Sequence, residues 1–586
     1  MANTLRCPGT LGPLTPTVGA MLSERRGMFR GLPAYRERRG GVYQTLMWPD
    51  FYEAVARVGT ALAGWGAAKG DVVATYTRNR EEMLLIELAA MSIGAVAAPV
   101  FAGYPAPQLD YILEHSGARM LLASDGPHLD AVLSTKASRR LKRIFVADPC
   151  ASRDGRVASF ETLMSAGARA RRQGKGAFER RLKAVGPNDA CLLMYTSGTT
   201  GRPKGVLLSH RNILAQRKAM HLLWKLKPGG RFLSYLPWHH SFGGIFELFC
   251  ALYTGACLTL DESYGRDVPL LIENFKRVRP TVYFSVPSIY QALVDEARRS
   301  AKAERAIFHP ELQFVFTAAA PLPRHLSDYF EAKRIPVVEG WGLTETSPCL
   351  TATRVRVKRR QGAVGWPIPG VELKLAEDGE ILVRGPHVML GYHKDPALTA
   401  RVITAAGWLH TGDFGEFSGH GLVLKCRRDG MFKLTTGQMV ISNTVENALV
   451  ASPLIRHAVA VGRDFVGALI FPDFQALERH AGVKRGASAS NGRLLKDARV
   501  RRLLRKALDA AAQSVPEKYA RPRAFVLAPR ELSLAQGELT PTMKVVRSRV
   551  VANFSAHVDA MFRRRASGGL ERGIIRLQPN HHDQRP

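Results

Sequence analysis

The chain has 586 residues, more than one hydrophobic core usually supports, so we expect two or more domains. Its hydrophobic fraction of 46% and charged fraction of 23% exclude a disordered or fibrous chain. The formal net charge of +33 favours anionic partners, but the basic residues are spread along the chain without a nucleic-acid-binding motif. We therefore expect no nucleic-acid partner, with weak attraction to an anionic membrane surface as an alternative use of the charge.

The cysteines and the apolar segments indicate the compartment. Seven cysteines are scattered without a Cys-x-x-Cys pair, which argues against a disulfide framework or a zinc site and suits a reducing cytoplasm. Residues 1–26 contain no continuous apolar core and do not form a secretory signal. The longest apolar run, 88–104, is broken by Gly94 and Pro99 and predicts a buried helix followed by a buried strand. We predict a cytoplasmic protein, with peripheral contact to the membrane as the alternative.

Apolar periodicity predicts an alternation of strands and helices along most of the chain. Residues 1–45 show no clear period and read as an irregular segment. A helix at 50–65 is followed by strands at 71–76, 94–100, 120–123 and 143–147, a pattern that indicates parallel sheets covered by helices. Residues 166–183 predict an exposed basic helix. Further strands are predicted at 191–195, 231–236, 257–260, 281–286, 312–316 and 335–338, and short strands at 372–375, 380–383 and 421–425 are typical of a small antiparallel barrel or sheet.

A dense glycine–threonine loop follows the predicted strand at 191–195. Residues 195–205 read YTSGTTGRPKG, in which glycines allow close backbone approach, hydroxyls and amides supply donors, and Lys204 adds a cation. This is the chemistry that polyphosphate binding requires, whereas a flexible surface hairpin would not need it. The loop is not a Walker P-loop, because Lys204 precedes Gly205 and not a serine or threonine. The predicted phosphate contacts are Thr196, Ser197, Gly198, Thr199, Thr200, Gly201 and Lys204.

The stretch 195–212, YTSGTTGRPKGVLLSHRN, resembles the signature of the adenylate-forming enzymes. These include acyl-CoA and aryl-CoA synthetases, luciferases and nonribosomal adenylation domains, and the resemblance continues in order from about residue 48 to residue 553. It implies an α/β multidomain fold: a large N-terminal domain of helix-flanked sheets with a small distorted barrel, and a small mobile α+β C-terminal domain. We place these domains at 46–426 and 431–566, with a hinge at 427–430, the irregular segment 1–45 before them and a disordered tail at 567–586.

The second motif is EGWGLTET at 339–346. By resemblance, Trp341 stacks on adenine, Thr344 contacts the α-phosphate and Glu345 binds Mg²⁺, while Glu339 and Gly340 belong to the same nucleotide-binding string. An aromatic face suits a purine, and a carboxylate suits a hard cation.

Upstream of this motif, TAAAPL at 317–322 resembles the family's nucleotide loop. The resemblance implies that Ala318 and Ala319 flank the adenine and acyl groups. The family often has glycine at one or two of these alanine positions, so the added methyl groups could narrow the pocket.

Two motifs follow around residues 407–430. In GWLHTGD at 407–413, the resemblance implies that Asp413 binds both ribose hydroxyls, since a carboxylate accepts two hydrogen bonds. In CRRDG at 426–430, Arg427 stands at the position of the nucleotide-binding arginine and Asp429 at that of the hinge pivot, while Cys426 replaces the usual acidic residue. A few hinge dihedrals can absorb a large domain rotation.

The last motif is GELTPTMK at 537–544. The resemblance implies that Lys544 reaches into the site for adenylation and leaves when the small domain rotates. A cation there would stabilise charge on the attacking carboxylate and the α-phosphate. The predicted catalytic residues are therefore Lys544, Thr344, Glu345 and Arg427.

Three stretches resemble the fatty-acid enzymes more than the aryl or acetyl enzymes. They are LPWHHSF at 236–242, VGRDFVGALIFPDF at 461–474 and GELTPTMK itself. The first implies that His240 lies beside the acyl or nucleotide pocket, and we predict that His240, Ala319 and Gly342 line the substrate pocket. Trp238 and Phe242 could equally be packing residues.

The sequence thus predicts a fatty acid–CoA ligase, most like the long-chain enzymes, with ATP, Mg²⁺ and CoA as cofactor and co-substrates. Fatty acid and ATP would give acyl-AMP and pyrophosphate, and CoA would then displace AMP. One alternative is an acyl-AMP ligase that loads an acyl carrier protein, and another is activation of a different carboxylic acid. A non-catalytic nucleotide- or lipid-binding relative is disfavoured because the catalytic set is complete.

Overall fold

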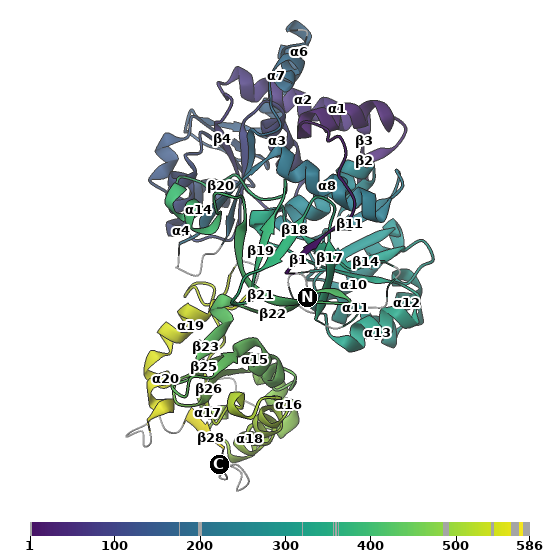
Figure 1. Cartoon of the computed structure of the whole chain (residues 1–586). Coiled ribbons are helices and arrows are strands. Elements are labelled where there is room, and N and C mark those ends of the chain that lie inside the picture. Colours follow the sequence, from purple (N-terminus) through teal and green to yellow (C-terminus); the bar gives the residue numbers. More distant parts are fainter. Residues whose placement is uncertain are drawn as a thin grey trace. The chain divides into compact units, whose positions relative to one another are not determined.

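The computed structural model describes residues 3–174, 176–196, 202–318, 320, 322–355, 357, 360, 362–483, 491–540, 544–563 and 573–577. The chain divides into two compact units (Figure 1). The first comprises Met1–Thr196, Arg202–Thr411 and Gly415–Leu424, and the second comprises Ser197–Gly201, Gly412–Phe414 and Lys425–Pro586.

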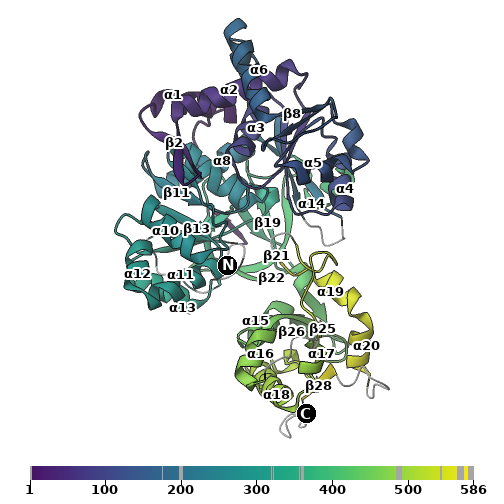
Figure 2. The ribbon, with the colours of Figure 1, turned by 180° about the vertical axis from the view of Figure 1, so that it is seen from behind.

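An eight-stranded sheet in the first unit confirms the predicted βαβ units. Its parallel strands alternate in the faces they present: Val73 joins one apolar core, whereas Val72 and Ala74 join another on the opposite face. Helices α4 (Ala106–Ser116) and α5 (Gly126–Leu133) pack together on the second face (Figure 2). The strand order is β20 (Gly391–Tyr392), β10 (Lys204–Ser209), β9 (Ala190–Thr196), β5 (Val96–Val100), β4 (Val72–Tyr76), β6 (Met120–Ala123), β7 (Arg143–Val146) and β8 (Val157–Ser159).

The short strands after residue 363 are the antiparallel end of a ten-stranded sheet whose other end, β15–β14–β13, is parallel. The order is β1 (Thr4–Arg6), β18 (Glu372–Leu375), β19 (Glu380–Arg384), β21 (Leu409–Ser418), β22 (Gly421–Arg427), β17 (Ala363–Pro367), β16 (Thr351–Ala352), β15 (Val337–Trp341), β14 (Phe314–Thr317) and β13 (Val282–Ser285).

The prediction that residues 1–45 are irregular is wrong. This segment contains β1, helix α1 (Val18–Met28) and strands β2 (Pro33–Arg39) and β3 (Val42–Met47). β2 pairs in parallel with β12 (Cys257–Leu260), which itself pairs with β11 (Arg231–Ser234), and the amide of Val18 donates to Nδ1 of His210 over 3.2 Å. These partners lie far away in the sequence, so the local pattern of a charged stretch such as PAYRERR does not reveal them.

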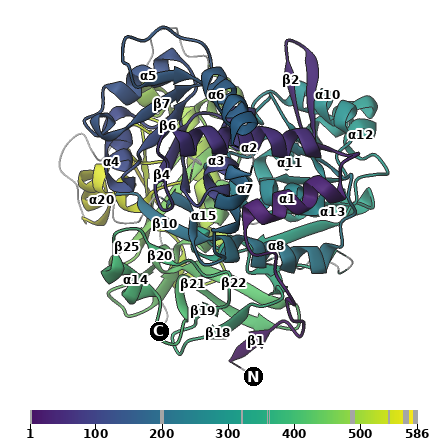
Figure 3. The ribbon, with the colours of Figure 1, turned by 90° about the horizontal axis from the view of Figure 1, so that it is seen from above.

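Helices cover the sheets of the first unit, and α1, α2 and α7 lie side by side (Figure 3). The predicted basic helix at 166–183 covers the end of α6 and all of α7, and it is only partly exposed because Gly167 and Phe178 are buried. The remaining helices are α2 (Trp48–Gly64), α3 (Glu81–Ser92), α4 (Ala106–Ser116), α5 (Gly126–Leu133), α6 (Phe160–Gln173), α7 (Ala177–Lys183), α8 (His210–Trp224), α9 (Leu248–Thr254), α10 (Val268–Val278), α11 (Pro287–Arg299), α12 (Ala301–Ile307), α13 (Arg324–Ala332) and α14 (Pro396–Val402).

The second unit is an α+β fold around a four-stranded sheet. One apolar core joins this sheet to α15, α16 and α18, and a second core joins its other face to α19 and α20 (Figure 1). Its strands are β23 (Met431–Lys433) paired with β24 (Met439–Ile441), and the sheet β25 (Ile455–Gly462), β26 (Val466–Pro472), β27 (Ala524–Leu527) and β28 (Ile574–Arg576). Its helices are α15 (Ser442–Val450), α16 (Phe474–Ala481), α17 (Asn491–Leu494), α18 (Ala498–Gln513), α19 (Arg547–Asn553) and α20 (Ser555–Phe562).

Strand β28 corrects the prediction of a disordered tail at 567–586. Ile574 and Ile575 are buried, and β28 pairs antiparallel with β27 at the edge of the sheet. Ile574 and Ile575 are buried because β27 lies beside them, and the local sequence pattern does not show that pairing. The other tail residues at 567–572 and 578–586 lie outside the described residues. Within the described ranges, no helix is long and apolar enough to cross a membrane.

Candidate active site

The predicted phosphate loop joins two antiparallel strands, β9 and β10. Thr196 pairs with Lys204 and Tyr195 with Gly205 across this hairpin. Helix α4 supports the hairpin from outside: the hydroxyl of Tyr111 donates to the carbonyl of Pro203 over 3.1 Å, and the Tyr195 hydroxyl lies 2.9 Å from Nδ1 of His115. The predicted contacts Ser197, Gly198, Thr199, Thr200 and Gly201 lie outside the described residues.

Tyr392 links the predicted phosphate lysine to the predicted metal carboxylate. Its hydroxyl donates to Oε1 of Glu345 over 2.9 Å, and Nζ of Lys204 lies 5.6 Å from the centre of its ring. Tyr392 is at the end of β20, directly opposite Val206 of β10, so the sheet register holds its ring next to the base of the loop. A cation over an aromatic face is attracted to the ring quadrupole. The structure therefore brings Lys204 and Glu345 together through one side chain.

Thr344 and Glu345 stand in a 3₁₀ turn, Thr344–Thr346, shortly after β15. The Thr344 hydroxyl lies 3.0 Å from the hydroxyl of Ser241, and Thr346 closes the turn by accepting from the amide of Leu343 over 3.0 Å. Gly342 must be glycine here, because a Cβ would lie 1.7 Å from the carbonyl oxygen of Pro348. This contact assigns Gly342 a backbone-packing role beside its predicted place in the acyl pocket.

The predicted nucleotide-binding string is the end of β15. Glu339 is buried, and its amide donates to the Thr353 hydroxyl over 2.8 Å. Trp341 is 7% exposed, so most of its indole surface is covered by the protein. A Cβ on Gly340 would lie 2.5 Å from the ring of Phe316, which explains glycine at this position. Ala318 follows β14 and is partly buried against the main core, while Ala319 lies outside the described residues.

In the second unit, Asp413, Arg427 and Lys544 interact electrostatically. Asp413 is buried, and Nε of Arg427 lies 3.1 Å from its Oδ1. Much of Lys544 is exposed to solvent. The protein atoms around its ammonium nevertheless lower the pKa of Lys544, and the positive charge of Arg427 lowers that pKa further. The negative charge of Asp413 acts in the opposite direction. The amide of Lys544 donates to the Thr540 hydroxyl over 3.0 Å, and this bond fixes the backbone of Lys544 at the end of the predicted motif. Three residues predicted from separate motifs therefore share one electrostatic environment.

His240 begins a buried segment that contains the π-helix Phe242–Glu247. Its Nδ1 accepts from the amide of Phe242 over 3.3 Å. Phe242 packs on Phe284 and Phe316, with ring centres 6.4 and 5.9 Å away, which identifies it as a core residue. Trp238 is also buried, and its indole nitrogen donates to Ser234 over 3.2 Å.

The predicted hinge residue Asp429 belongs to the 3₁₀ turn Arg428–Gly430, which connects β22 to β23. The guanidinium of Arg428 lies 5.2 Å from the ring centre of Phe414. The side chain of Asp429 lies outside the described atoms, so its role stays a prediction.

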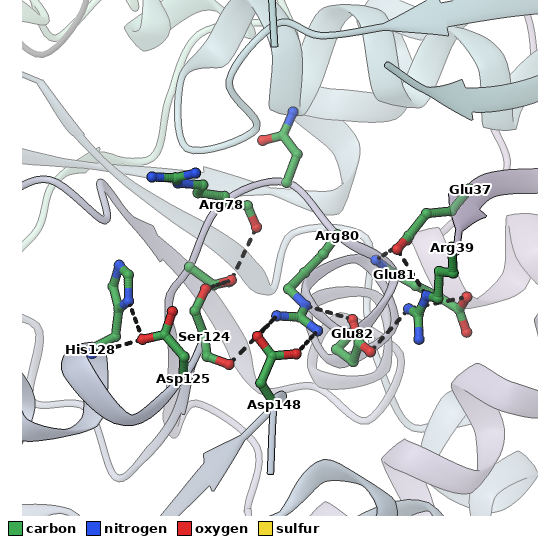
Figure 4. Close-up of polar contacts among 12 residues, drawn as sticks. Glu37, Arg39, Arg78, Arg80, Glu81, Glu82, Ser124, Asp125, His128 and Asp148 are labelled. Carbon is green, nitrogen blue, oxygen red and sulfur yellow. Dashed lines mark hydrogen bonds and ion pairs between the residues drawn. The ribbon is translucent and has the colours of Figure 1, made fainter. Parts of the chain in front are cut away.

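A charged cluster occupies the carboxyl edge of the eight-stranded sheet (Figure 4). Arg80, which follows β4, donates from Nη2 and Nη1 to the two carboxylate oxygens of Asp148 over 2.8 and 3.1 Å, and from Nε to Glu82 over 2.7 Å. Beside it, Nδ1 of His128 lies 2.6 Å from Asp125, the N-cap of α5. Nη1 of Arg80 also donates to the carbonyl oxygen of Ser124 over 3.5 Å, so these bonds tie together the loops that follow β4, β6 and β7, and the donors of Arg80 are directed to protein oxygens.

Sequence reasoning did not identify Tyr392 or Ser241 as members of the site. Tyr392 is 47 residues from Glu345, and Ser241 is 103 residues from Thr344. Tyr392 stands outside the recognised motifs, and Ser241 lies in the LPWHHSF stretch at 236–242, for which the sequence predicted a role of His240 only. Only strand pairing and helix packing bring them to their partners.

The arrangement suits a nucleotide with Mg²⁺. No group of three or more His, Cys, Asp and Glu side chains suited to a metal occurs in the part of the chain that the structure describes. Mg²⁺ does not need such a group of side chains, because it is usually bound by one or two carboxylates together with substrate phosphates. Glu345 fits that role, since an ionised carboxylate has acceptor capacity beyond the one bond from Tyr392.

Comparison with known proteins supports this description. In sequence, the chain is similar to the long-chain-fatty-acid–CoA ligase FadD15 of Mycobacterium bovis, with 28% identity over 601 residues covering 93% of this chain and 97% of the relative. It is also 26% identical over 596 residues to the peroxisomal long chain acyl-CoA synthetase 7 of Arabidopsis thaliana, covering 90% and 83%.

Solved structures share the fold. The anthranilate CoA ligase AuaEII in complex with anthranoyl-AMP gives a TM-score of 0.72 at 20% identity, covering 93% of this chain and 99% of that one. The o-succinylbenzoate CoA synthetase MenE of Bacillus subtilis, in complex with ATP and magnesium, gives 0.70 at 20% identity, covering 92% and 99%.

Family models match nearly the whole chain. The AMP-binding enzyme model matches residues 24–393, and the AMP-binding enzyme C-terminal domain model matches residues 429–566. The first match alone spans more than half of the chain, and it includes the phosphate hairpin, the 3₁₀ turn with Glu345, and Tyr392. This chain therefore belongs to the AMP-binding enzyme family, the adenylate-forming enzymes.

Proposed function

We propose that this protein is an AMP-forming fatty acid–CoA ligase, acting on long-chain acids. Fatty acid and ATP·Mg²⁺ react to acyl-AMP and pyrophosphate, and the CoA thiol then displaces AMP to give acyl-CoA. The observation that carries the substrate class is similarity over 93% of the chain to a relative named as a long-chain-fatty-acid–CoA ligase. The adenylation step is supported by Lys204, Tyr392 and Glu345, which meet in the first unit.

In the adenylation step, the first unit supplies phosphate and metal contacts. Mg²⁺, when bound, neutralises charge on the triphosphate. Glu345 holds the metal, Thr344 donates to the α-phosphate, and Lys204 acts with the hairpin loop on the outer phosphates. Trp341 presents its remaining open surface to adenine. These roles rest on the motifs together with the observed packing.

The second unit supplies the ribose carboxylate and the mobile cation. Asp413 accepts from the ribose hydroxyls, and Arg427, paired with it, orients that carboxylate. Lys544 stabilises the negative charge that develops when the substrate carboxylate attacks the α-phosphate. Rotation about Asp429 between the two half-reactions would withdraw Lys544, and the short turn Arg428–Gly430 suits such a pivot. The domains would then be 46–426 and 431–566.

An apolar wall supports an acyl substrate. Aromatic rings line the core behind His240, where Phe246 and Phe316 lie 4.6 Å apart between centres. His240, Ala319 and Gly342 would border the carboxyl end of the acid.

The +33 charge favours one further acceptor, an acidic acyl carrier protein, and also a peripheral contact with an anionic membrane. Carrier loading would use the same adenylation chemistry and differ only in the thiol that attacks. A membrane contact would supply fatty acid from the bilayer.

One assay tests these proposals together. The protein is incubated with ATP, Mg²⁺ and carboxylic acids of graded length, with and without CoA, and pyrophosphate and thioester are measured. We expect pyrophosphate release that depends on a long-chain acid and acyl-CoA only when CoA is present. Acid-dependent pyrophosphate without any acyl-CoA would favour the carrier protein. No acid-dependent pyrophosphate would exclude the ligase function.

A further inference from the structure

The side chain of a buried asparagine holds the segment 236–241, which contains the predicted pocket residue His240. Asn79 lies in the loop between β4 and α3 and is 5% exposed. Its Nδ2 donates to the carbonyl of Leu236 over 2.8 Å, and its Oδ1 accepts from the amide of Trp238 over 2.9 Å. One side-chain amide therefore satisfies a backbone acceptor and a backbone donor of this distant segment, as buried backbone groups require.

Asn79 is itself fixed from both sides along the chain. Arg80, the next residue, is bound by two hydrogen bonds to Asp148 in the charged cluster (Figure 4). Two residues before Asn79, the hydroxyl of Thr77 lies 2.5 Å from the hydroxyl of Ser124. Ser124 follows β6 and Asp148 follows β7, so three neighbouring loops at the carboxyl edge of the eight-stranded sheet hold the asparagine in place.

The segment that Asn79 holds packs backbone to backbone on the π-helix that follows it. A Cβ on Gly243 would lie 2.5 Å from the carbonyl oxygen of Pro237, and a Cβ on Gly244 would lie 1.9 Å from that of Trp238. The amide of His240 donates to the carbonyl of Pro237 over 3.1 Å, and its carbonyl accepts from the amide of Gly244 over 2.8 Å. The position of residues 236–238 therefore determines the position of the residues that come directly after them.

The end of this segment reaches the proposed phosphate contact. Ser241 is buried, and its hydroxyl lies 3.0 Å from the hydroxyl of Thr344. A hydroxyl has a single hydrogen to donate. When Thr344 donates that hydrogen to the α-phosphate, it can only accept from Ser241. The Ser241 hydroxyl then determines the direction in which Thr344 donates.

We propose that Asn79 is a positioning residue for adenylation, an inference that rests on the proposed function. Asn79 holds the segment 236–241 so that Ser241 directs the Thr344 hydroxyl to the α-phosphate and His240 borders the acid. Without Asn79, two buried backbone groups lose their partner and the segment can shift. The chemical step should therefore slow more than ATP binding weakens, because other parts of the chain hold the adenine and the ribose.

The kinetics of four full-length variants test this role. We measure kcat and the KM for ATP of acid-dependent pyrophosphate release at least about 10 °C below each melting temperature. Asn79→Ala should lower kcat about 10–30-fold and Ser241→Ala about 5–10-fold, with the KM for ATP within about two-fold of wild type. The double variant should be no slower than Asn79→Ala, because both changes interrupt one path, whereas independent losses would multiply. Asn274→Ala is the matched control: its buried amide donates to Asp261 over 2.7 Å on α10, so its loss should lower the melting temperature and leave kcat unchanged.

The outcomes separate this inference from the proposed function. A wild type without acid-dependent pyrophosphate would reject the ligase function and the positioning role together. An active wild type whose kcat is matched by folded Asn79→Ala would reject the positioning role alone, and so would multiplied losses in the double variant or an equal loss of kcat in Asn274→Ala. If Asn79→Ala does not fold, Asn79→Asp keeps the volume and the acceptor for Trp238 but, when ionised, cannot donate to Leu236. It should lower kcat without raising the KM for ATP, and an unchanged kcat in Asn79→Asp or in Ser241→Ala would overturn the proposal.

Discussion

The hydroxyl of Tyr392 donates a hydrogen bond of 2.9 Å to Oε1 of Glu345. The same ring faces the ammonium of Lys204, 5.6 Å from its centre. Glu345 must present its remaining lone pairs to Mg²⁺ in the proposed reaction, so a bond that fixes one oxygen also orients the other. We therefore propose that Tyr392 positions both Glu345, the proposed metal carboxylate, and Lys204, the proposed phosphate lysine.

Tyr392→Phe keeps the ring under Lys204 and removes only the hydroxyl. Because a hydrogen bond to a charged group contributes about 1.5–3 kcal/mol, we expect acid-dependent pyrophosphate release to fall about 10–100-fold, with a higher Mg²⁺ concentration needed for half-maximal rate. The rate is measured across a Mg²⁺ titration. Tyr329→Phe, in α13 away from the site, is the matched control. An unchanged Mg²⁺ dependence in Tyr392→Phe would refute the positioning role.

Removal of the Lys544 ammonium should separate the two half-reactions. Lys544→Ala should slow adenylation by about 100-fold or more, because a positioned charge at the developing anion is lost. Thioester formation from supplied acyl-AMP and CoA should stay close to the wild-type rate. The two steps are measured separately with purified acyl-AMP. Equal losses in both steps would contradict the assigned role.

The lowered pKa of Lys544 predicts how adenylation depends on pH. Its surroundings and the charge of Arg427 favour the neutral amine, so the catalytic cation is lost as pH rises through a pKa below the ordinary 10.5. We expect the adenylation rate to decline on the alkaline side at a lower pH than a solvent-exposed lysine would give. In Lys544→Arg the decline should disappear, because arginine stays protonated there. The same alkaline decline in both proteins would assign it to another group.

Buried Glu87 predicts a pH dependence of stability. Burial raises its pKa to about 8, while the hydrogen bond from Thr75, 2.6 Å long, acts in the opposite direction. In the unfolded chain Glu87 ionises near 4.5, so between about pH 4.5 and 8 the folded state binds the extra proton. The contribution of this residue to stability is full below pH 4.5 and is lost as pH rises to about 8, by about 1.4 kcal/mol per pH unit.

Glu87→Gln is neutral in both states and should remove that slope. The free energy of unfolding is measured by urea titration at several pH values from 5 to 8 for wild type and variant. The difference between the two should shift steadily in favour of Glu87→Gln as pH rises. Glu161→Gln, at an exposed position on α6, should leave the wild-type slope unchanged. A constant difference between wild type and Glu87→Gln would rule out the raised pKa.

Gly167 sets the distance between α6 and α2. A Cβ there would lie 2.0 Å from the carbonyl oxygen of Arg57 on α2, so Gly167→Ala must push the two helices apart. We expect a loss of about 1–3 kcal/mol in the free energy of unfolding, although alanine favours a helix more than glycine does. Gly155→Ala meets no atom within 4 Å and is the control. Equal stability of Gly167→Ala and the wild type would show that α6 and α2 can move apart without loss of free energy of unfolding, which would contradict this prediction.

Local patterns in the amino-acid sequence were sufficient to predict the parallel βαβ units and the strands before the phosphate loop and before Trp341. They also revealed the motifs that contain Glu345, Asp413 and Lys544. These features depend on the period of apolar residues and on loop chemistry, both of which act over a few neighbouring positions. Residues 1–45 and strand β28 were misjudged because each is stabilised by a distant strand.

Tertiary structure decided which side chains meet. Tyr392 reaches Glu345 because β20 pairs with β10, and Ser241 reaches Thr344 across 103 residues. The burial of Arg217 on α8 is likewise invisible in the sequence, where arginine on a helix reads as a solvated residue. Burial and pairing are properties of packed elements, and they arise only when distant segments exclude water from between them.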